Sequence, residues 1–207
     1  MIAEAQPAHL PLPGGREGAT VRLQPLNTGE LTAPPAWFER EEGRMATLHA
    51  FGVRVDRSNF MRLPMPAFLV EHPGAGPLLI DTGLHPSVAV DPKQNFGRLL
   101  ALGFRGLEMT QEQSVPAQLR ARGLDAADIG YVLMTHMHVD HASAISEFPD
   151  ATFVLAKQEW DALKDGKVTD GYVKSQYDFG FDYRTFDFDS KGTDSFASFG
   201  RSFDLFG

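Results

Sequence analysis

Apolar segments of strand length recur in the first half of the chain. Residues 67–71 (AFLVE) and 78–81 (LLID) are apolar runs on either side of the turn-forming residues 73–76 (PGAG), a pattern that predicts a β-hairpin. Residues 49–55 alternate between large apolar and smaller or polar side chains, which predicts a further half-buried strand. The first half is therefore predicted to form short strands.

Helical periodicity enters in the second half. Between Ser114, a good N-terminal cap, and Gly123, a common C-terminal stop, the apolar spacing predicts a helix. Residues 131–135 (YVLMT) form a continuous apolar run, which is typical of a strand covered on both faces. Residues 152–156 (TFVLA) predict another strand, which leads into a helix over 157–164. Strands that alternate with helices in this way indicate the α/β class.

The length and composition suit a globular protein. The chain has 207 residues, 43% of them hydrophobic and 22% charged, which is enough for the single domain that we predict over 16–207. Residues 1–15 contain three prolines and are predicted to be a loose tail. Residues 179–207 hold eight of the 16 phenylalanines among Asp, Ser and Gly, and the alternatives there are an irregular hairpin, a substrate lid, a surface awaiting a partner or an ordinary loop.

The charge and the absence of cysteine exclude several classes of function. With 19 basic and 27 acidic residues the net charge is −8, and no basic run is present, which argues against nucleic acid and anionic membranes as partners. Without cysteine there are no disulfides, no thiolate metal sites and no cysteine nucleophile. No signal-like or membrane-spanning apolar run is evident, so a cytoplasmic location is predicted.

The segment 135–141 (THMHVDH) is the strongest candidate for chemistry. It holds three of the seven histidines and directly follows a predicted buried strand, where a loop can present functional groups on a rigid support. His136 and His138 project to the same side of an extended chain, and Asp140 and His141 follow where the chain turns. Imidazole and carboxylate are ligands that Zn²⁺ accepts, so a metal centre is predicted. A Ser–His–Asp nucleophile is the weaker alternative, because no G-x-S-x-G occurs.

In its context this segment resembles the metallo-β-lactamase-fold hydrolases, and within them the N-acyl-homoserine-lactone lactonase-like group. The resemblance extends over about residues 48–187 and includes AFLVE…LLIDTG, SVPAQLRARGL, YVLMTHMHVDH and FPDATFVLAKQEW. It implies an α/β fold of the αββα sandwich type, built from two similar halves with metal ions between them.

Carried over residue by residue, the resemblance implies that His136 and His138 bind a first metal ion, while Asp140 and His141 serve a second. Asp140 is also implied to be catalytic, because it takes up the proton as the ring opens. Asp81, in the D-T-G bend, is implied to support the ligands through a hydrogen bond. The implied cofactors are two divalent metal ions, with Zn²⁺ the best match.

The family pattern continues with a T-P-G-H segment, a bridging aspartate, a last histidine and a nearby tyrosine, and none of these has a match after His141. We therefore expect the N-terminal half of the sandwich to be present, the C-terminal half to be largely missing and the metal site to be incomplete within this chain. Phenylalanines near the C-terminus would then lack partners, which predicts self-association. These are Phe186, Phe188, Phe196, Phe199, Phe203 and Phe206.

Two further groups are weaker candidates. His85 follows the D-T-G bend and is a possible substitute ligand, although a loop position at the pocket rim is the commoner role. Phe96, Leu99 and Phe104 are expected either to flank a substrate entrance or, more often, to form a helix core.

The predicted function is that of a metal-dependent hydrolase, which opens a lactone or related ester by attack of a metal-bound hydroxide. Its partner is then a small ester or lactone. One alternative is a thioester hydrolase of the same fold, similar to glyoxalase II. Another is a catalytically incomplete fragment that holds metal weakly, because zinc sites need three or four protein ligands.

Overall fold

A mixed eight-stranded β-sheet organises the chain in the computed structural model, which describes residues 3–37, 43, 45–50, 52–190 and 192–207. The strand order is β1-β8-β7-β6-β4-β3-β2-β5, and β9 and β10 form a separate pair. The strands are β1 Ala5–Pro7, β2 Arg22–Ala33, β3 Met61–His72, β4 Gly76–Ile80, β5 Leu107–Glu108, β6 Tyr131–Leu133, β7 Thr152–Ala156, β8 Asp182–Phe186, β9 Asp194–Phe196 and β10 Phe199–Ser202.

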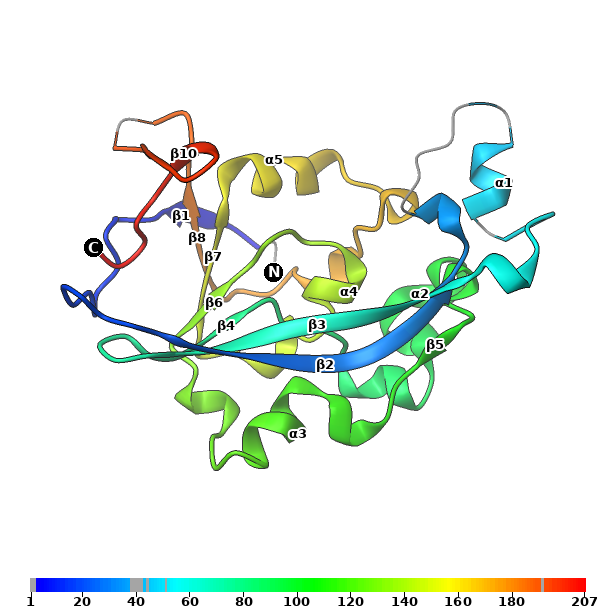
Figure 1. The fold of residues 1–207 in the computed structure, drawn as a ribbon, viewed down its shortest axis with the longest axis horizontal. Coiled ribbons are helices and arrows are strands. Elements are labelled where there is room, and N and C mark those ends of the chain that lie inside the picture. The colour runs from blue at the N-terminus through cyan, green and yellow to red at the C-terminus, as the bar shows by residue number, and fades with distance from the viewer. Residues whose placement is uncertain (1–2, 38–42, 44, 51, 191) are drawn as a thin grey trace.

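Short helices connect the strands. The α-helices are α1 Ala46–Ala50, α2 Pro92–Gly103, α3 Val115–Arg120, α4 Val139–Ala142 and α5 Lys157–Asp165. Single 3-10 turns occur at Pro35–Trp37, Arg57–Asn59, Pro86–Ala89, Gln111–Gln113, Ala126–Asp128, Ile145–Glu147, Val168–Asp170 and Lys174–Gln176. In Figure 1 the twisted sheet has β2 and β3 running across the view and β6 to β8 running steeply upward.

One row of apolar side chains crosses the sheet and forms the main core. Leu69, Leu79, Val132, Phe153 and Tyr183 pair in register from β3 to β8, and each is at most 1% exposed. Side chains of α3 and α5 belong to the same buried cluster. Burial of this row favours one register, because a shift by one residue would turn every one of these side chains to the other face.

The hairpin and the later strands predicted from sequence are confirmed. β3 and β4 pair antiparallel around residues 73–75, the strand over 131–133 pairs in parallel with β4, and the strand over 152–156 pairs in parallel with that one. The helices after Ser114 and over 157–165 also form. Strand β2, which the sequence patterns did not predict, pairs with β3 from Arg22↔Glu71 to Ala33↔Met61.

The strand predicted over residues 49–55 is wrong. The chain forms helix α1 up to Ala50 and then turns, with Gly52 and Arg54 at φ values of 73° and 62°. Left-handed residues interrupt an extended chain, so the alternation could not be realised as a strand. Phe51, which was part of that prediction, lies outside the described residues.

Residues 1–15 were predicted to be a loose tail, but residues 5–7 form a strand. Strand β1 pairs in parallel with β8, from Ala5↔Tyr183 to Pro7↔Thr185, and the Ala8 N–H donates to the Thr185 carbonyl at 2.7 Å. An edge strand tolerates Pro7, because an edge has one unpaired side. The single domain over 16–207 stays a prediction.

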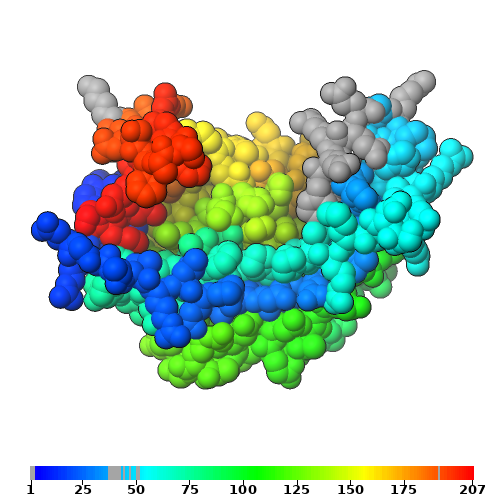
Figure 2. Space-filling model, viewed as in Figure 1, coloured from blue at the N-terminus to red at the C-terminus, as the bar shows by residue number. Residues whose placement is uncertain are grey.

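The phenylalanine-rich segment forms strand β8 and the β9–β10 hairpin. Phe186, Phe188 and Phe203 pack on one another, with ring centroids 5.0–5.8 Å apart, and Phe206 contacts Tyr131 at 5.8 Å. These four rings therefore have partners, contrary to the prediction. Two other rings, Phe196 and Phe199, are 70% and 66% exposed. Figure 2 shows this C-terminal segment, in red, beside the N-terminal strand.

The α/β class with a large sheet is confirmed. In the described residues the strands build one large sheet and the separate β9–β10 pair. That the second half of the sandwich is missing stays a prediction. Among the helices of those residues, none combines the length and the apolar character needed to cross a membrane.

Candidate metal centre

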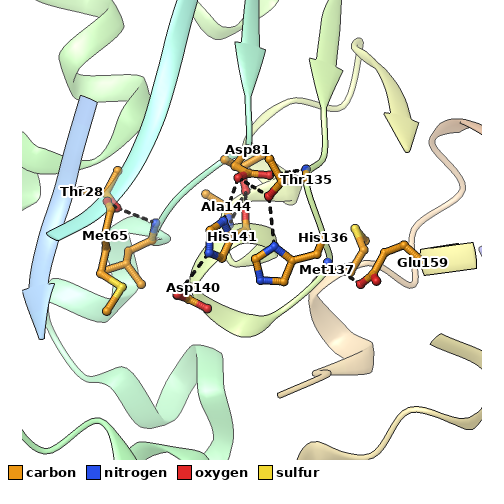
Figure 3. Close-up of polar contacts among 12 residues, drawn as sticks. Thr28, Met65, Asp81, Thr135, His136, Met137, Asp140, His141, Ala144 and Glu159 are labelled. Atoms are coloured by element: carbon orange, nitrogen blue, oxygen red, sulfur yellow. Dashed lines mark hydrogen bonds and ion pairs between the residues drawn. The ribbon is translucent and has the colours of Figure 1, made fainter. Parts of the chain in front are cut away.

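The candidate site lies where two neighbouring parallel strands end. Strand β4 ends at Ile80 and is followed by Asp81, while β6 ends at Leu133 and is followed by the histidine segment. Because both carboxyl ends meet at one edge of the sheet, residues far apart in sequence come together there. Figure 3 shows Asp81 above the rings of His136 and His141.

Asp81 joins the two strand ends. Its carboxylate accepts the Thr135 backbone N–H at 2.8 Å and the Thr135 hydroxyl at 2.7 Å, and it lies 2.7 Å from His141 Nδ1. The residue is 3% exposed and has a left-handed backbone, with φ of 60°, which Asp tolerates better than most residues. Asp81 thus contacts the candidate ligand His141 at its Nδ1, and its support of a metal ligand, which the resemblance implied, stays a prediction.

The three predicted histidine rings gather around one small volume. The ring centroids of His136 and His141 are 4.0 Å apart, and those of His136 and His138 are 4.6 Å apart. The His138 carbonyl accepts the N–H groups of His141 and Ala142, both at 2.9 Å, so a helical turn begins immediately after His138. That turn brings the side chain of His141 back toward His136.

Two carboxylates hold His141 from both ring nitrogens. Asp81 Oδ2 lies 2.7 Å from Nδ1, and Asp140 Oδ2 lies 3.4 Å from Nε2. Burial lowers the pKa of His141, but the hydrogen bonds and charges of Asp140 and Asp81 outweigh it and raise that pKa to about 10. Burial raises the pKa of Asp140, while its hydrogen bond to His141 and the charges of His141 and His136 bring it below its ordinary value.

His136 is kept neutral in the same cluster. Burial, followed by the charges of His141 and His138, lowers the pKa of its imidazole. The Thr135 hydroxyl donates its proton to Asp81, so at the 3.0 Å contact with His136 Nδ1 the ring nitrogen must be the donor. This tautomer leaves Nε2 of His136 without a proton, which is the form that a metal ligand needs.

The donor set suits a divalent metal ion in its chemistry. Three imidazoles and the Asp140 carboxylate are the groups that zinc accepts when no thiolate is present. Within the described part of the chain, however, no three His, Asp or Glu side chains are already arranged to hold an ion. In their present contacts, both ring nitrogens of His141 face carboxylates.

The weaker candidates lie elsewhere. His85 Nε2 is 3.0 Å from Glu147 Oε1, and its Nδ1 accepts the Ser87 N–H at 3.0 Å, so its ring is engaged away from the other histidines. Phe96 and Phe104 are 1% and 6% exposed and pack on each other at 4.8 Å, which makes them core residues and not an entrance. Leu99 is 55% exposed.

A polar network behind α4 was missed by the sequence reasoning. The Asn95 side chain on α2 donates to the Ser143 carbonyl at 3.2 Å, and its Oδ1 accepts from the Ser143 hydroxyl at 2.7 Å and from the Gln176 amide at 2.5 Å. The Ser143 hydroxyl also accepts the His85 N–H at 3.0 Å. Isolated Asn, Ser and Gln residues carry no spacing signal, so the network becomes visible only when the three elements meet.

We expect Asn95→Ala to lower the free energy of unfolding by about 1–3 kcal/mol, because the buried amide of Gln176 and the Ser143 hydroxyl lose their partner. Urea denaturation of the metal-free protein measures the change. Gln94→Ala, at an exposed position on the same helix, is the matched control and should stay within about 0.5 kcal/mol of the parent. Equal stabilities of the two variants would contradict the role of the network.

Comparison with known proteins connects this arrangement to a family. The model of the metallo-beta-lactamase superfamily matches residues 63–204. N-acyl homoserine lactonase AttM of Rhizobium radiobacter is 35% identical over 118 residues, which are 56% of this chain and 44% of that protein. An N-acyl homoserine lactonase of Bacillus cereus is 31% identical over 106 residues, 51% of this chain and 42% of that protein. The chain spans less than half the length of these curated relatives.

Solved structures share the fold at low sequence identity. A mutant of AiiA from B. thuringiensis, with N-decanoyl-L-homoserine bound at its active site, superposes with a TM-score of 0.61 at 19% identity, over 83% of this chain and 62% of that one. An N-acyl homoserine lactone hydrolase, with N-hexanoyl-L-homoserine bound at its catalytic metal center, gives 0.58 at 18% identity, over 84% and 62%. The family model matches residues 63–204, which are more than half of this chain, and the chain therefore belongs to the metallo-beta-lactamase superfamily.

Proposed function

We propose that this chain carries a hydrolytic site that opens lactones or related esters, with His136, His138, Asp140 and His141 as ligands of two divalent metal ions, zinc being the best match. The observation that carries the proposal is the convergence of three imidazoles and one carboxylate at the ends of β4 and β6. The named activity of the lactonase relatives supports a lactone as the substrate.

The chain's own residues have separate tasks in this proposal. Divalent metal ions held by the histidines and Asp140 would polarise the ester carbonyl and activate water at neutral pH. Asp81 keeps the ring of His141 in place through the contact at Nδ1. Asp140, whose pKa lies below its ordinary value, is ionised at neutral pH. One of its Oδ atoms would accept the proton that the attacking water loses and pass it to the alkoxide that leaves as the ring opens.

A second candidate is a fragment that binds metal weakly. The observation in its favour is that, in the described residues, no three donors are yet arranged to hold an ion. Metal content after dialysis distinguishes the two candidates: about two ions per chain supports the hydrolase, whereas less than one ion, lost on dialysis, supports the fragment.

Self-association through the C-terminal segment also stays a prediction, with exposed Phe196 and Phe199 as its apolar surface.

The direct test is hydrolysis of an N-acyl homoserine lactone, followed through proton release, before and after exhaustive chelation. We expect activity that chelation removes and added Zn²⁺ restores. Parallel assays with a thioester, a phosphodiester and a β-lactam separate the lactonase from the thioesterase alternative. Undiminished hydrolysis after chelation would contradict the metal-dependent site.

A further inference from the structure

The backbone between β6 and α4 is held by hydrogen bonds to residues outside this segment. Residues 134–138 lie in neither a helix nor a strand, and their N–H groups donate to distant parts of the chain. The Met134 N–H donates to the Val154 carbonyl, and the Thr135 N–H donates to Asp81. The Met137 N–H, between the two histidines, donates to Glu159. The positions of His136 and His138 therefore depend on side chains that the motif does not contain.

Glu159 fixes the middle of this segment. It lies in the first turn of α5, and its Oε1 accepts the Met137 N–H at 2.8 Å. Figure 3 shows its carboxylate directed at the Met137 backbone, on the side away from Asp81. Met137 itself is fully buried, so the backbone between the two histidines is held by packing and by this hydrogen bond together.

Tyr172 connects Glu159 with the ring of His138. Its own ring meets that of His138 edge to face, with centroids 5.1 Å apart and an interplanar angle of 66°. Burial, together with the charge of Glu159 and a hydrogen bond to it, raises the pKa of Tyr172. The Tyr172 hydroxyl therefore keeps its proton at neutral pH.

Gly171 lets this loop approach the histidine closely. Its carbonyl accepts the Val139 N–H at 2.9 Å, and a Cβ at this position would lie 3.1 Å from Cδ2 and 3.2 Å from Cγ of His138. Its φ of +95° belongs to the left-handed region that favours glycine. The backbone of the loop therefore packs directly on the His138 ring, and a side chain here would push the ring away.

We propose that Glu159 and Tyr172 are positioning residues for His136 and His138, with Gly171 providing the room for the contact. The assignment rests on the proposed function in one respect, namely that His138 is a ligand of the hydrolytic site. The two residues act through His138 and the Met137 backbone, as residues behind a metal ligand do when they fix its ring orientation.

The test compares truncating and conservative variants in the metal-free protein and in Zn²⁺ titrations. Glu159→Ala removes the acceptor for the Met137 N–H, whereas Glu159→Gln keeps one carbonyl oxygen there. Tyr172→Ala removes the ring, whereas Tyr172→Phe keeps its contact with His138. Gln158→Ala, in the same turn of α5 but bonded to Asp187, is the matched control. The readouts are the imidazole ¹⁵N and ¹H NMR signals of His138 and the Kd for Zn²⁺.

We expect both alanine variants to shift the His138 signals and to weaken Zn²⁺ binding by about 10–100-fold, while the conservative variants keep most of the affinity. The proposal is overturned if both alanine variants leave the His138 signals and the Kd at the values of Gln158→Ala. Should Glu159→Ala not fold, Tyr172→Ala decides by the same two readouts. If the parent protein hydrolyses nothing but the His138 signals shift, the proposed function fails while the positioning role stands.

Discussion

Replacing His138 with alanine should reduce lactone hydrolysis by more than about 100-fold, because loss of a metal ligand exceeds the 10–100-fold cost of losing a residue behind one. The ring of His138 packs between His136 on one side and Tyr172 on the other. Removing the imidazole therefore removes one metal donor from the histidine cluster. The measurements are kcat/KM for an N-acyl homoserine lactone and the Kd for Zn²⁺.

The control for this experiment is His9→Ala. His9 is exposed near the N-terminus, so its loss removes an imidazole of the same kind without touching the cluster. We expect this control to keep the parent activity and the parent Kd. Full activity in His138→Ala, with the control unchanged, would exclude His138 as a ligand.

The second large effect is expected at Asp81. Asp81→Ala removes the common acceptor of the Thr135 N–H, the Thr135 hydroxyl and His141, and should lower the free energy of unfolding by about 3 kcal/mol. Asp81→Asn is the matched variant, because Asn also tolerates the left-handed backbone and keeps one acceptor oxygen. It should lose less stability than the alanine variant. Denaturation of the metal-free protein in urea gives both values.

The pH dependence sharpens this prediction. The pKa of His141 is about 10 in the folded protein and 6.5 ordinarily, so the stabilisation from its charged form is fully present below about pH 6.5. It is lost as the pH rises toward 10. The stability difference between the parent and Asp81→Ala should therefore narrow from pH 6.5 to pH 10. A difference that grows over this range would contradict the pairing of Asp81 with protonated His141.

Local patterns predicted the elements that carry the site. The hairpin of β3 and β4, the strand before the histidines and the helix after residue 156 all follow from apolar runs and turn residues that lie next to each other in sequence. The same kind of pattern was wrong at residues 49–55, where positive φ values of Gly52 and Arg54 break the extended chain. The alternation of apolar and polar side chains gives no sign of residues that adopt a positive φ.

Elements at the sheet edge could not be predicted in this way. Strand β1 exists because its backbone pairs with β8, more than 170 residues later, although its own sequence is proline-rich and short. The partners of Phe186, Phe188 and Phe203 are likewise one another, brought together by the return of the C-terminal hairpin. Such contacts depend on where the chain folds back and not on neighbouring residues.

The sequence by itself determined the fold class and the four clustered candidates His136, His138, Asp140 and His141, because hydrophobic period, turn chemistry and motif spacing are local properties of the chain. The family was indicated by the resemblance of these segments to known hydrolases. The resemblance already implied Asp81, 60 residues from His141, as a support for the ligands. Only the tertiary structure revealed Glu159, which is 22 residues from the Met137 backbone that it binds. Those partners meet because β4, β6 and β7 lie side by side in parallel and end at one edge of the sheet. Strand order and register are set by long-range packing, which no single stretch of sequence encodes.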